Sequence, residues 1–462
     1  MDKKGRRFSD EKEIIDFPSS EEQQSETAET NPSKYDKKLR EKNSKKLEKQ
    51  LKKQRKAEKR AQHNGDTPEE ELEDPREAER KKKKRSITKK RVIIAVIIAV
   101  VLFAVVFFAA NPEKFSLKSI SNFFNYGVFN RDSEEKFPLD IQGESITTGN
   151  FIRKGQNICF ASDTHTKELN NYGKTVFSAQ HAFINPVLCV SSKKELVYNL
   201  GGTGFQILSD KQVEYTSEAP DNILVADIND NGVYALVTQS SGYLSKLYVY
   251  DEENNQIYAY SFADYYVTSV SLNSSGKQAV ISGVSALDGV NISSLYVLDF
   301  TKDTPVYMSE FENNLIYDVS YLGDKYACAI GRSASYCINT GNGDVVNYEY
   351  EGKALTAYDI NTETNTYTVS ISNSGDGRNC EIVSFSSNGN KDKSFNVDDK
   401  VIDMSVYKGR IALLTNDEVM LYSKDGKQYN KKTLRSDPHA VALYTGSVAY
   451  VLCTGYIDSV SL

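Results

Sequence analysis

Four aspartates recur in a repeated pattern of the chain, and their carboxylates are the side chains best placed for chemistry. Asp227, Asp318, Asp359 and Asp403 each lie in the first strand that we predict for their repeat, although not all at one aligned position. If these strands surround a central channel, the carboxylates form a ring that can hold a cation or a basic ligand, because hard cations prefer oxygen ligands. The alternative is structural: the carboxylates bond to nearby backbone or face solvent in the channel.

A second candidate cation contact starts at the first of these aspartates. Asp227, Asn229, Asn231 and Gly232 match the first half of a calcium-binding loop, D-x-[DN]-x-[DN]-G. The twelfth position, which should supply a bidentate glutamate, is Thr238. Because the other repeats also carry turn residues at this place, the pattern favours a hairpin in which an Asn-Gly pair supplies positive φ.

The six cysteines are scattered, and none forms a C-x-x-C pair. Cys328 and Cys337 are centred on Arg332 and Ser333, so a tight turn there would make them a non-hydrogen-bonded cross-strand pair within reach of a disulfide. The sequence contains neither G-x-S-x-G nor H-E-x-x-H. We therefore predict no catalytic residue and no cofactor, and we keep this cysteine pair as a candidate disulfide.

The elements that would position these residues form a repeat. From about Phe137 onward, short stretches rich in Val, Ile, Tyr and Thr alternate with turn residues, and one strand-turn-strand phrase starts at 145, 186, 223, 267, 316, 355, 401 and 440. This spacing, with room for about four strands per repeat, is typical of β-propeller blades. We predict an all-β propeller of eight four-stranded blades, or seven if the copy at Ser145 is not a blade. The last copy is short, and Lys136–Ile141 is predicted to complete it and cover the open sheet edge.

Two stretches carry a resemblance to a known family: HAFINPVLCVSSKKELVYNLGGTGFQIL (His181–Leu208) and NGVYALVTQSSGYLSKLYVYD (Asn231–Asp251). Over about residues 135–462, the chain resembles an uncharacterised bacterial domain-of-unknown-function family of single-span membrane proteins with a WD-repeat or quinoprotein-like propeller. The chain has no Trp, so the GH…WD signature of true WD repeats is absent. The resemblance implies an architecture and a topology, and it implies no activity.

An unbroken apolar run, VIIAVIIAVVLFAVVFFAA, occupies Val92–Ala110. As a helix it would measure roughly 28 Å, close to the ~30 Å hydrocarbon core of a bilayer. We predict an uncleaved transmembrane helix, because 91 residues precede the run. Basic residues before it place the N-terminus in the cytoplasm. Those expected to contact anionic lipid headgroups of the inner leaflet are Lys81, Lys82, Lys83, Lys84, Arg85, Lys89, Lys90 and Arg91.

Charge is divided across the predicted span. Of the formal net charge of −6, residues 1–91 contribute +8 and residues 112–462 contribute −14. Residues 1–91 have few apolar side chains, so we predict a cytoplasmic arm, disordered or charged-helical, without a folded domain. Residues 111–135 are predicted as a linker and residues 136–462 as the propeller. We do not expect a nucleic-acid partner.

These features favour binding over catalysis. We predict a single-pass cell-membrane protein whose extracytoplasmic propeller is a binding or scaffold module for a protein, ligand or cell-wall partner at the envelope. The alternative is a propeller enzyme that acts at the channel mouth on an extracytoplasmic substrate. That alternative requires clustered carboxylates or a platform for a cofactor.

Overall fold

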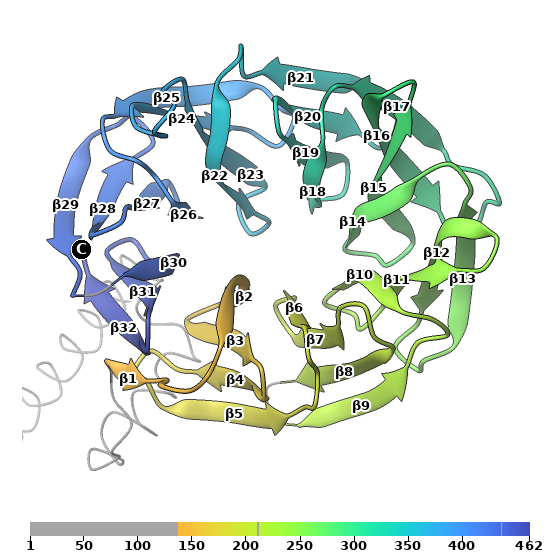
Figure 1. Cartoon of the computed structure of the whole chain (residues 1–462), viewed down its shortest axis with the longest axis horizontal. Coiled ribbons are helices and arrows are strands. Elements are labelled where there is room, and N and C mark those ends of the chain that lie inside the picture. Colours follow the sequence, from red (N-terminus) through yellow and green to blue (C-terminus); the bar gives the residue numbers. More distant parts are fainter. Residues whose placement is uncertain (1–136, 210–211, 436) are drawn as a thin grey trace, which may run out of the picture. The chain divides into compact units, whose positions relative to one another are not determined.

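A computed structural model describes residues 137–209, 212–435 and 437–462. The predicted arm, transmembrane helix and headgroup-binding basic residues lie outside these ranges. The described strands form eight four-stranded antiparallel sheets arranged in a ring (Figure 1). The prediction of an eight-bladed all-β propeller is therefore confirmed, and the copy at Ser145 is a blade. Among the described residues, no helix is long and apolar enough to cross a membrane.

Each blade consists of consecutive strands, and the chain passes from the innermost to the outermost strand (Figure 1). Blade 1 contains β2 (Ile146–Lys154), β3 (Asn157–Ser162), β4 (His165–Leu169) and β5 (Thr175–Gln180), and blade 2 contains β6 (Pro186–Val190), β7 (Lys194–Asn199), β8 (Gly204–Ser209) and β9 (Val213–Glu218). Blade 3 contains β10 (Ile223–Ile228), β11 (Tyr234–Ser240), β12 (Tyr243–Tyr250) and β13 (Gln256–Phe262). Blade 4 contains β14 (Tyr266–Leu272), β15 (Gln278–Leu287), β16 (Val290–Asp299) and β17 (Tyr307–Glu312).

Blades 5 to 8 continue the same order. Blade 5 contains β18 (Ile316–Leu322), β19 (Tyr326–Gly331), β20 (Ala334–Asn339) and β21 (Val345–Glu349), and blade 6 contains β22 (Ala354–Asn361), β23 (Thr366–Ser372), β24 (Cys380–Phe385) and β25 (Lys391–Val397). Blade 7 contains β26 (Asp403–Tyr407), β27 (Arg410–Leu414), β28 (Glu418–Ser423) and β29 (Gln428–Thr433). Blade 8 contains β30 (Pro438–Thr445), β31 (Val448–Cys453), β32 (Tyr456–Ser461) and β1 (Leu139–Asp140).

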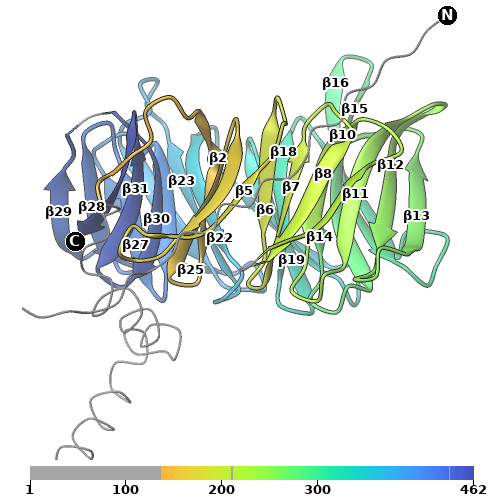
Figure 2. The same cartoon turned by 90° about the horizontal axis from the view of Figure 1, so that it is seen from below.

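The ring has two faces, which we name by their loops. The upper face carries the loops that join second to third strands and those that join one blade to the next, and it points up in Figure 2. The lower face carries the loops that join first to second and third to fourth strands. Inner strands lie nearest the axis, so their side chains are the ones that can line the channel (Figure 1).

The ring closes through the N-terminal strand of the propeller, as predicted. In β1, Leu139 pairs with Ile457 and Asp140 pairs with Tyr456 of β32. The ring of Phe137 lies 5.5 Å from that of Tyr450 and packs in the cluster between blades 8 and 1. Because β1 runs antiparallel to β32, the chain enters the propeller at the lower face.

The core consists of apolar clusters between neighbouring blades. Residues of the second and third strands are mostly buried, whereas β29 is exposed throughout. In the described residues, eight clusters occupy the eight blade junctions. Seven of them contain nine to fourteen buried residues. The cluster between blades 1 and 2 contains only six, namely Cys159, Ala161, Ala179, Leu188, Val197 and Leu208.

Candidate functional site

Three of the four predicted channel aspartates accept a backbone N–H group of the following blade. The Oδ2 atom of Asp227 accepts the backbone N–H of Leu272 on the next inner strand, at 2.7 Å. Asp359 accepts the N–H of Val406 at 2.6 Å in the same way. Asp403 likewise accepts the N–H of Val441 in the following blade, at 2.8 Å. Inner strands are sheet edges with unpaired N–H groups, so these carboxylates satisfy donors that would otherwise lie open toward the channel.

The fourth aspartate has a different environment. Asp318 accepts the hydroxyl of Ser269 from the preceding blade at 3.0 Å, and the hydroxyl of Tyr358 from the following blade at 3.4 Å. Ser269 in turn accepts the N–H of Val319, so here a hydroxyl holds the backbone donor. This difference agrees with the observation that the four aspartates do not share one aligned position.

Neutral side chains form the same link in other blades. Asn150 Oδ1 accepts the N–H of Leu188 at 2.9 Å, and its amide group donates to the carbonyl of Pro186. Ser405 accepts the N–H of Leu443 at 3.0 Å. The link therefore needs an acceptor oxygen at the right distance and does not need a charge.

Burial changes the proton affinity of the four carboxyls. It raises the pKa of Asp227 and of Asp403 to about 7, although each carboxylate accepts backbone N–H bonds that oppose the shift. Burial raises the pKa of Asp359 to about 6 and also raises that of Asp318. The charged forms lose hydration at the inner strands, and neighbouring carboxylates add to the effect at Asp227 and Asp403.

The segment that resembles half of a calcium loop forms a hairpin turn, as the sequence favoured. Asn229 Oδ1 accepts the N–H groups of Asn231 and Val233, and Gly232 has a φ of 85°. The amide groups of Asn229 and Asn231 donate to carbonyls of the next blade. The oxygens of Asp227 and Asn229 that would face a cation thus accept backbone donors.

An arginine bridges two blades that are not neighbours. Arg153, on the inner strand of blade 1, forms an ion pair with Glu363 of blade 6 at 3.0 Å. Its guanidinium also lies 4.9 Å from the ring centre of Tyr407 in blade 7. Arg153 opposes the shift of Asp359 by favouring the charged carboxylate. A basic side chain of the protein therefore already reaches the acidic channel.

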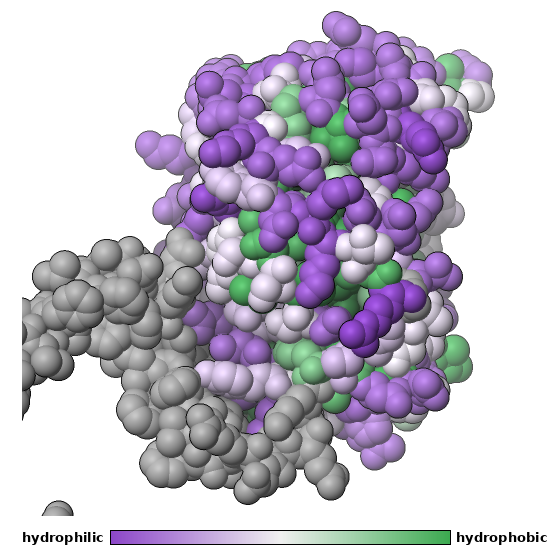
Figure 3. Space-filling view, turned by 90° about the vertical axis from the view of Figure 1, so that its left-hand side faces the viewer, coloured by the Kyte–Doolittle hydropathy of each residue, from purple (hydrophilic) through white to green (hydrophobic). Residues whose placement is uncertain are grey.

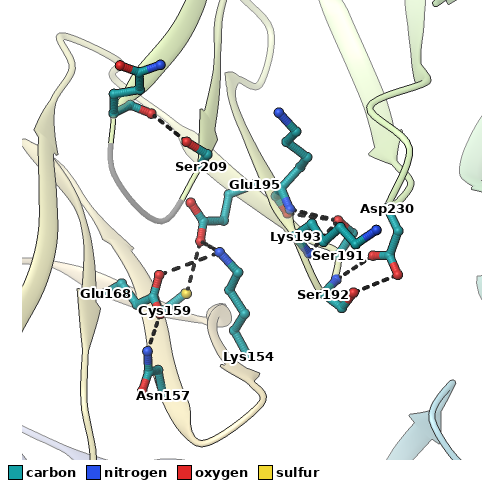
Figure 4. A network of polar contacts seen from close by, with 12 residues as sticks. Lys154, Asn157, Cys159, Glu168, Ser191, Ser192, Lys193, Glu195, Ser209 and Asp230 are labelled. Carbon is teal, nitrogen blue, oxygen red and sulfur yellow. Dashed lines mark hydrogen bonds and ion pairs between the residues drawn. The ribbon is translucent and has the colours of Figure 1, made fainter. Parts of the chain in front are cut away.

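A fully buried charged cluster, which no pattern in the sequence indicates, lies between blades 1 and 2 (Figure 4). The ammonium of Lys154 lies 2.5 Å from Glu195 Oε1 and 3.5 Å from Glu168 Oε2, and all three side chains are about 1 % exposed. Asn157 donates to Glu168, and the thiol of Cys159 donates to Glu195 at 3.5 Å. These charges lie at the junction with the smallest apolar cluster, so ion pairing holds two blades together where apolar contact is least.

The same cluster contains ligand types that metals use. Cys159, Glu168 and Glu195 each offer a ligand atom within 4.8 Å of the others, and no other group of three such side chains was found among the described residues. Lys154, however, places its ammonium between the two carboxylates, where a cation would bind. Burial raises the pKa of Glu195 and of Cys159, which disfavours the thiolate that a soft metal requires. The arrangement is that of a buried ion pair.

The cysteine pair has the predicted register but no disulfide. Cys328 and Cys337 are paired residues of β19 and β20, and both are buried free thiols. The Cys337 thiol donates to the carbonyl of Ser387 in blade 6, so it is directed at the next blade. A pocket of about 200 Å³ beside it is lined by residues that include Tyr326 and Asn388. It is smaller than the ~300–1,000 Å³ of typical ligand pockets.

Large apolar side chains are exposed in two places on the described surface. Five are on outermost strands, spread around the wall: Val213, Ile257, Met308, Val346 and Tyr429. Figure 3 shows part of this wall, where hydrophilic residues dominate and apolar ones are interspersed. The other six are on the upper face, in blades 2 to 5 and the loop that leads into blade 2: Ile184, Leu200, Tyr243, Tyr266, Leu287 and Tyr317. We call this second set the apolar crescent.

A comparison with known protein families shows to which family this chain belongs. The profile of a family described as "Family of unknown function (DUF5711)" matches residues 136–462. The chain belongs to this family. The match covers the whole described DUF5711 propeller, and it agrees with the resemblance to an uncharacterised propeller family. No curated protein matches the sequence.

Solved structures similar to the DUF5711 propeller include Sqt1 from Saccharomyces cerevisiae, with a TM-score of 0.52 and 8% identity over 71% of this chain and 99% of that chain. The C-terminal WD40 domain of Sif2 matches with a TM-score of 0.51 and 10% identity, over 71% and 98%. BamB from Moraxella catarrhalis matches with 0.44 and 12%, over 69% and 100%. At such identities the likenesses show the fold alone.

Proposed function

We propose that this protein is a single-pass membrane protein whose propeller lies outside the cytoplasm and binds a protein or cell-wall partner at the envelope. The observation that carries the binding role is the apolar crescent, which gathers exposed large apolar side chains on one half of one face. Exposed large apolar side chains that share one face favour an interaction site, because their exposure to water without a partner is unfavourable. The membrane location is supported by the apolar run Val92–Ala110 and the basic residues before it.

The hydrogen bonds of the channel carboxylates also support binding over catalysis. Asp227, Asp359 and Asp403 each hold a backbone N–H of the next blade, so their oxygens are engaged in linking the ring. The enzyme alternative has one observation in its favour. A carboxyl with a pKa of about 7 is suited to proton transfer, and Asp227 and Asp403 have this value.

Labelling of intact cells tests the location. The described native cysteines are buried or half-buried, so an engineered cysteine at exposed Ser241 offers an accessible thiol in the propeller. We expect a membrane-impermeant maleimide to label Ser241→Cys in intact cells, whereas Ser25→Cys in the N-terminal arm should react only after lysis. Labelling of Ser25→Cys alone in intact cells would refute the proposed topology.

Crosslinking on intact cells tests the binding role. An amine-reactive crosslinker should capture a reproducible protein or cell-wall adduct of the full-length chain. Failure to capture any adduct, together with turnover of a soluble substrate that Asp227→Asn abolishes, would favour the enzyme alternative.

A further inference from the structure

Blade 4 departs from the repeat in a way that ring formation does not require. Its second and third strands, β15 and β16, have ten residues each, whereas the corresponding strands of the other blades have five to eight. The resulting hairpin extends beyond the upper face (Figure 2). Ala286, Leu287, Asp288 and Gly289 at its tip are all exposed, and Leu287 is 63% exposed. A hairpin tip that exposes a leucine to this extent is available to a partner.

The hairpin lies within the apolar crescent. Tyr266 is the first residue of the inner strand of the same blade and is 54% exposed, and Tyr317 is the second residue of the inner strand of blade 5. Tyr243 stands at the second-to-third-strand loop of blade 3. Tyrosine supplies a large contact area with little loss of conformational entropy, and aromatic residues are enriched among those that dominate binding energy. The crescent therefore has the composition of a binding surface.

The upper-face loops of the two halves of the ring differ in how many charged residues they carry. The loops of the crescent half contain Asp221, Asp264 and Asp288, and their basic residue is Arg332. The loops of blades 6 to 8 carry many charged residues of both signs, and none of the exposed large apolar side chains in the described chain lies there. The crescent is thus apolar with an acidic margin, and it is complementary to a partner that is apolar and basic.

We infer that the apolar crescent binds a protein segment in which apolar side chains stand next to lysine or arginine, with the β15–β16 hairpin as one wall. This inference rests on the proposed binding function and specifies its surface and the chemistry of its partner. A bilayer fits less well, because acidic loops are repelled by anionic headgroups. Strand β1 starts at the lower face, which is opposite the crescent.

Site-specific photocrosslinking in intact cells tests the surface. The photoreactive residue p-benzoylphenylalanine replaces Tyr266 in the full-length chain, and a matched variant carries it at Tyr429, which is 46% exposed on an outermost strand. We expect the Tyr266 position to give a protein adduct whose crosslinked peptide contains apolar residues beside Lys or Arg. An adduct with lipid, with a second copy of the chain or with an acidic peptide would overturn the inference.

The two positions also separate this inference from the proposed function. Protein adducts from the Tyr429 position alone would leave the binding role standing and remove the crescent as its surface. Absence of protein adducts from both positions would refute the crescent as a protein-binding surface, whereas the binding role itself would be refuted by the whole-chain crosslinking described above.

Affinity for the crosslinked peptide, synthesised as a probe, gives a second readout. The double variant Tyr266→Ser/Leu287→Ser of the full-length chain should bind it at least 10-fold more weakly than the unaltered chain. The control Ile257→Ser/Met308→Ser removes two side chains of similar exposure from outermost strands of blades 3 and 4 and should change affinity less than 2-fold. Binding should weaken as salt is raised, because the acidic margin contributes. Equal losses in the two variants would overturn the inference.

Discussion

Removing the buried ammonium of Lys154 should destabilise the propeller far more than removing an exposed one. In Lys154→Met, a side chain of similar length fills the space, so the change isolates the charge. The two carboxylates left behind, on Glu168 and Glu195, are about 1% exposed and lose the cation that lay 3.5 and 2.5 Å from them. Breaking a buried ion pair from one side costs about 3–5 kcal/mol, because a charge remains without compensation.

The effect on thermal unfolding follows from the size of the propeller. Domains of 150–250 residues lose about 2–4 °C in Tm per kcal/mol, and the value falls with size. At about 2 °C per kcal/mol, we expect Lys154→Met to lower Tm by roughly 6–10 °C at pH 8. Few apolar contacts at this junction are present to offset the loss.

The loss of Tm in Lys154→Met should be larger at pH 8 than at pH 5. Burial already raises the pKa of Glu195 in the presence of Lys154, which opposes the shift, so the shift should increase when Lys154 is removed. A carboxyl whose pKa is raised by folding binds its proton more tightly in the folded state than in the unfolded state. The free energy of unfolding therefore falls as pH rises through the folded pKa. The Tm difference between Lys154→Met and the unaltered chain should therefore shrink between pH 8 and pH 5.

Scanning calorimetry of the full-length chain in mild detergent provides the assay. Lys194→Met is the matched control, because Lys194 pairs with Glu214 in blade 2 while both side chains are about one quarter exposed. Such partly exposed pairs contribute about 0–1 kcal/mol. The double variant Lys154→Met/Glu195→Gln should recover part of the lost stability. A Tm for Lys154→Met within 2 °C of the unaltered chain at pH 8, or a loss equal to that of Lys194→Met, would refute the reasoning.

Three further outcomes are expected. Asp227→Asn and Asp403→Asn should keep the links between blades, as Asn150 does in blade 1. Both variants should also show a smaller fall in Tm between pH 4 and pH 7 than the unaltered chain, because a folded pKa of about 7 makes the ionised carboxyl destabilising. An unchanged dependence of Tm on pH in calorimetry would contradict this. Deletion of residues 137–141 should expose the edge of β32 and cause concentration-dependent aggregation in light scattering, and a monodisperse deletion variant at the original Tm would count against closure by β1. Cys328 and Cys337 should resist iodoacetamide in the folded chain and react in urea, and mass spectrometry after alkylation would reveal a disulfide by missing adducts.

The sequence alone was sufficient to predict the ring. The predicted repeat starts fall within two residues of the inner strands, which begin at 146, 186, 223, 266, 316, 354, 403 and 438. Each blade is a local meander, so strand alternation and turn residues within about 40 residues specify it. The pairing of Cys328 with Cys337 follows from one tight turn for the same reason. The direction of the Cys337 thiol could not be predicted, because the carbonyl it contacts belongs to another blade.

Tertiary structure alone decided what the polar and apolar side chains do. Lys154 meets Glu195 across a blade junction, and Arg153 reaches Glu363 across 210 residues of sequence. The residues of the apolar crescent likewise come from several blades. They are far apart in the sequence and share one face only in the folded ring. Local pattern determines which residues form strands, but only closure of the ring fixes which blades face each other and which side chains remain exposed to a partner. That closure depends on contacts summed over the whole propeller, and no short segment encodes it.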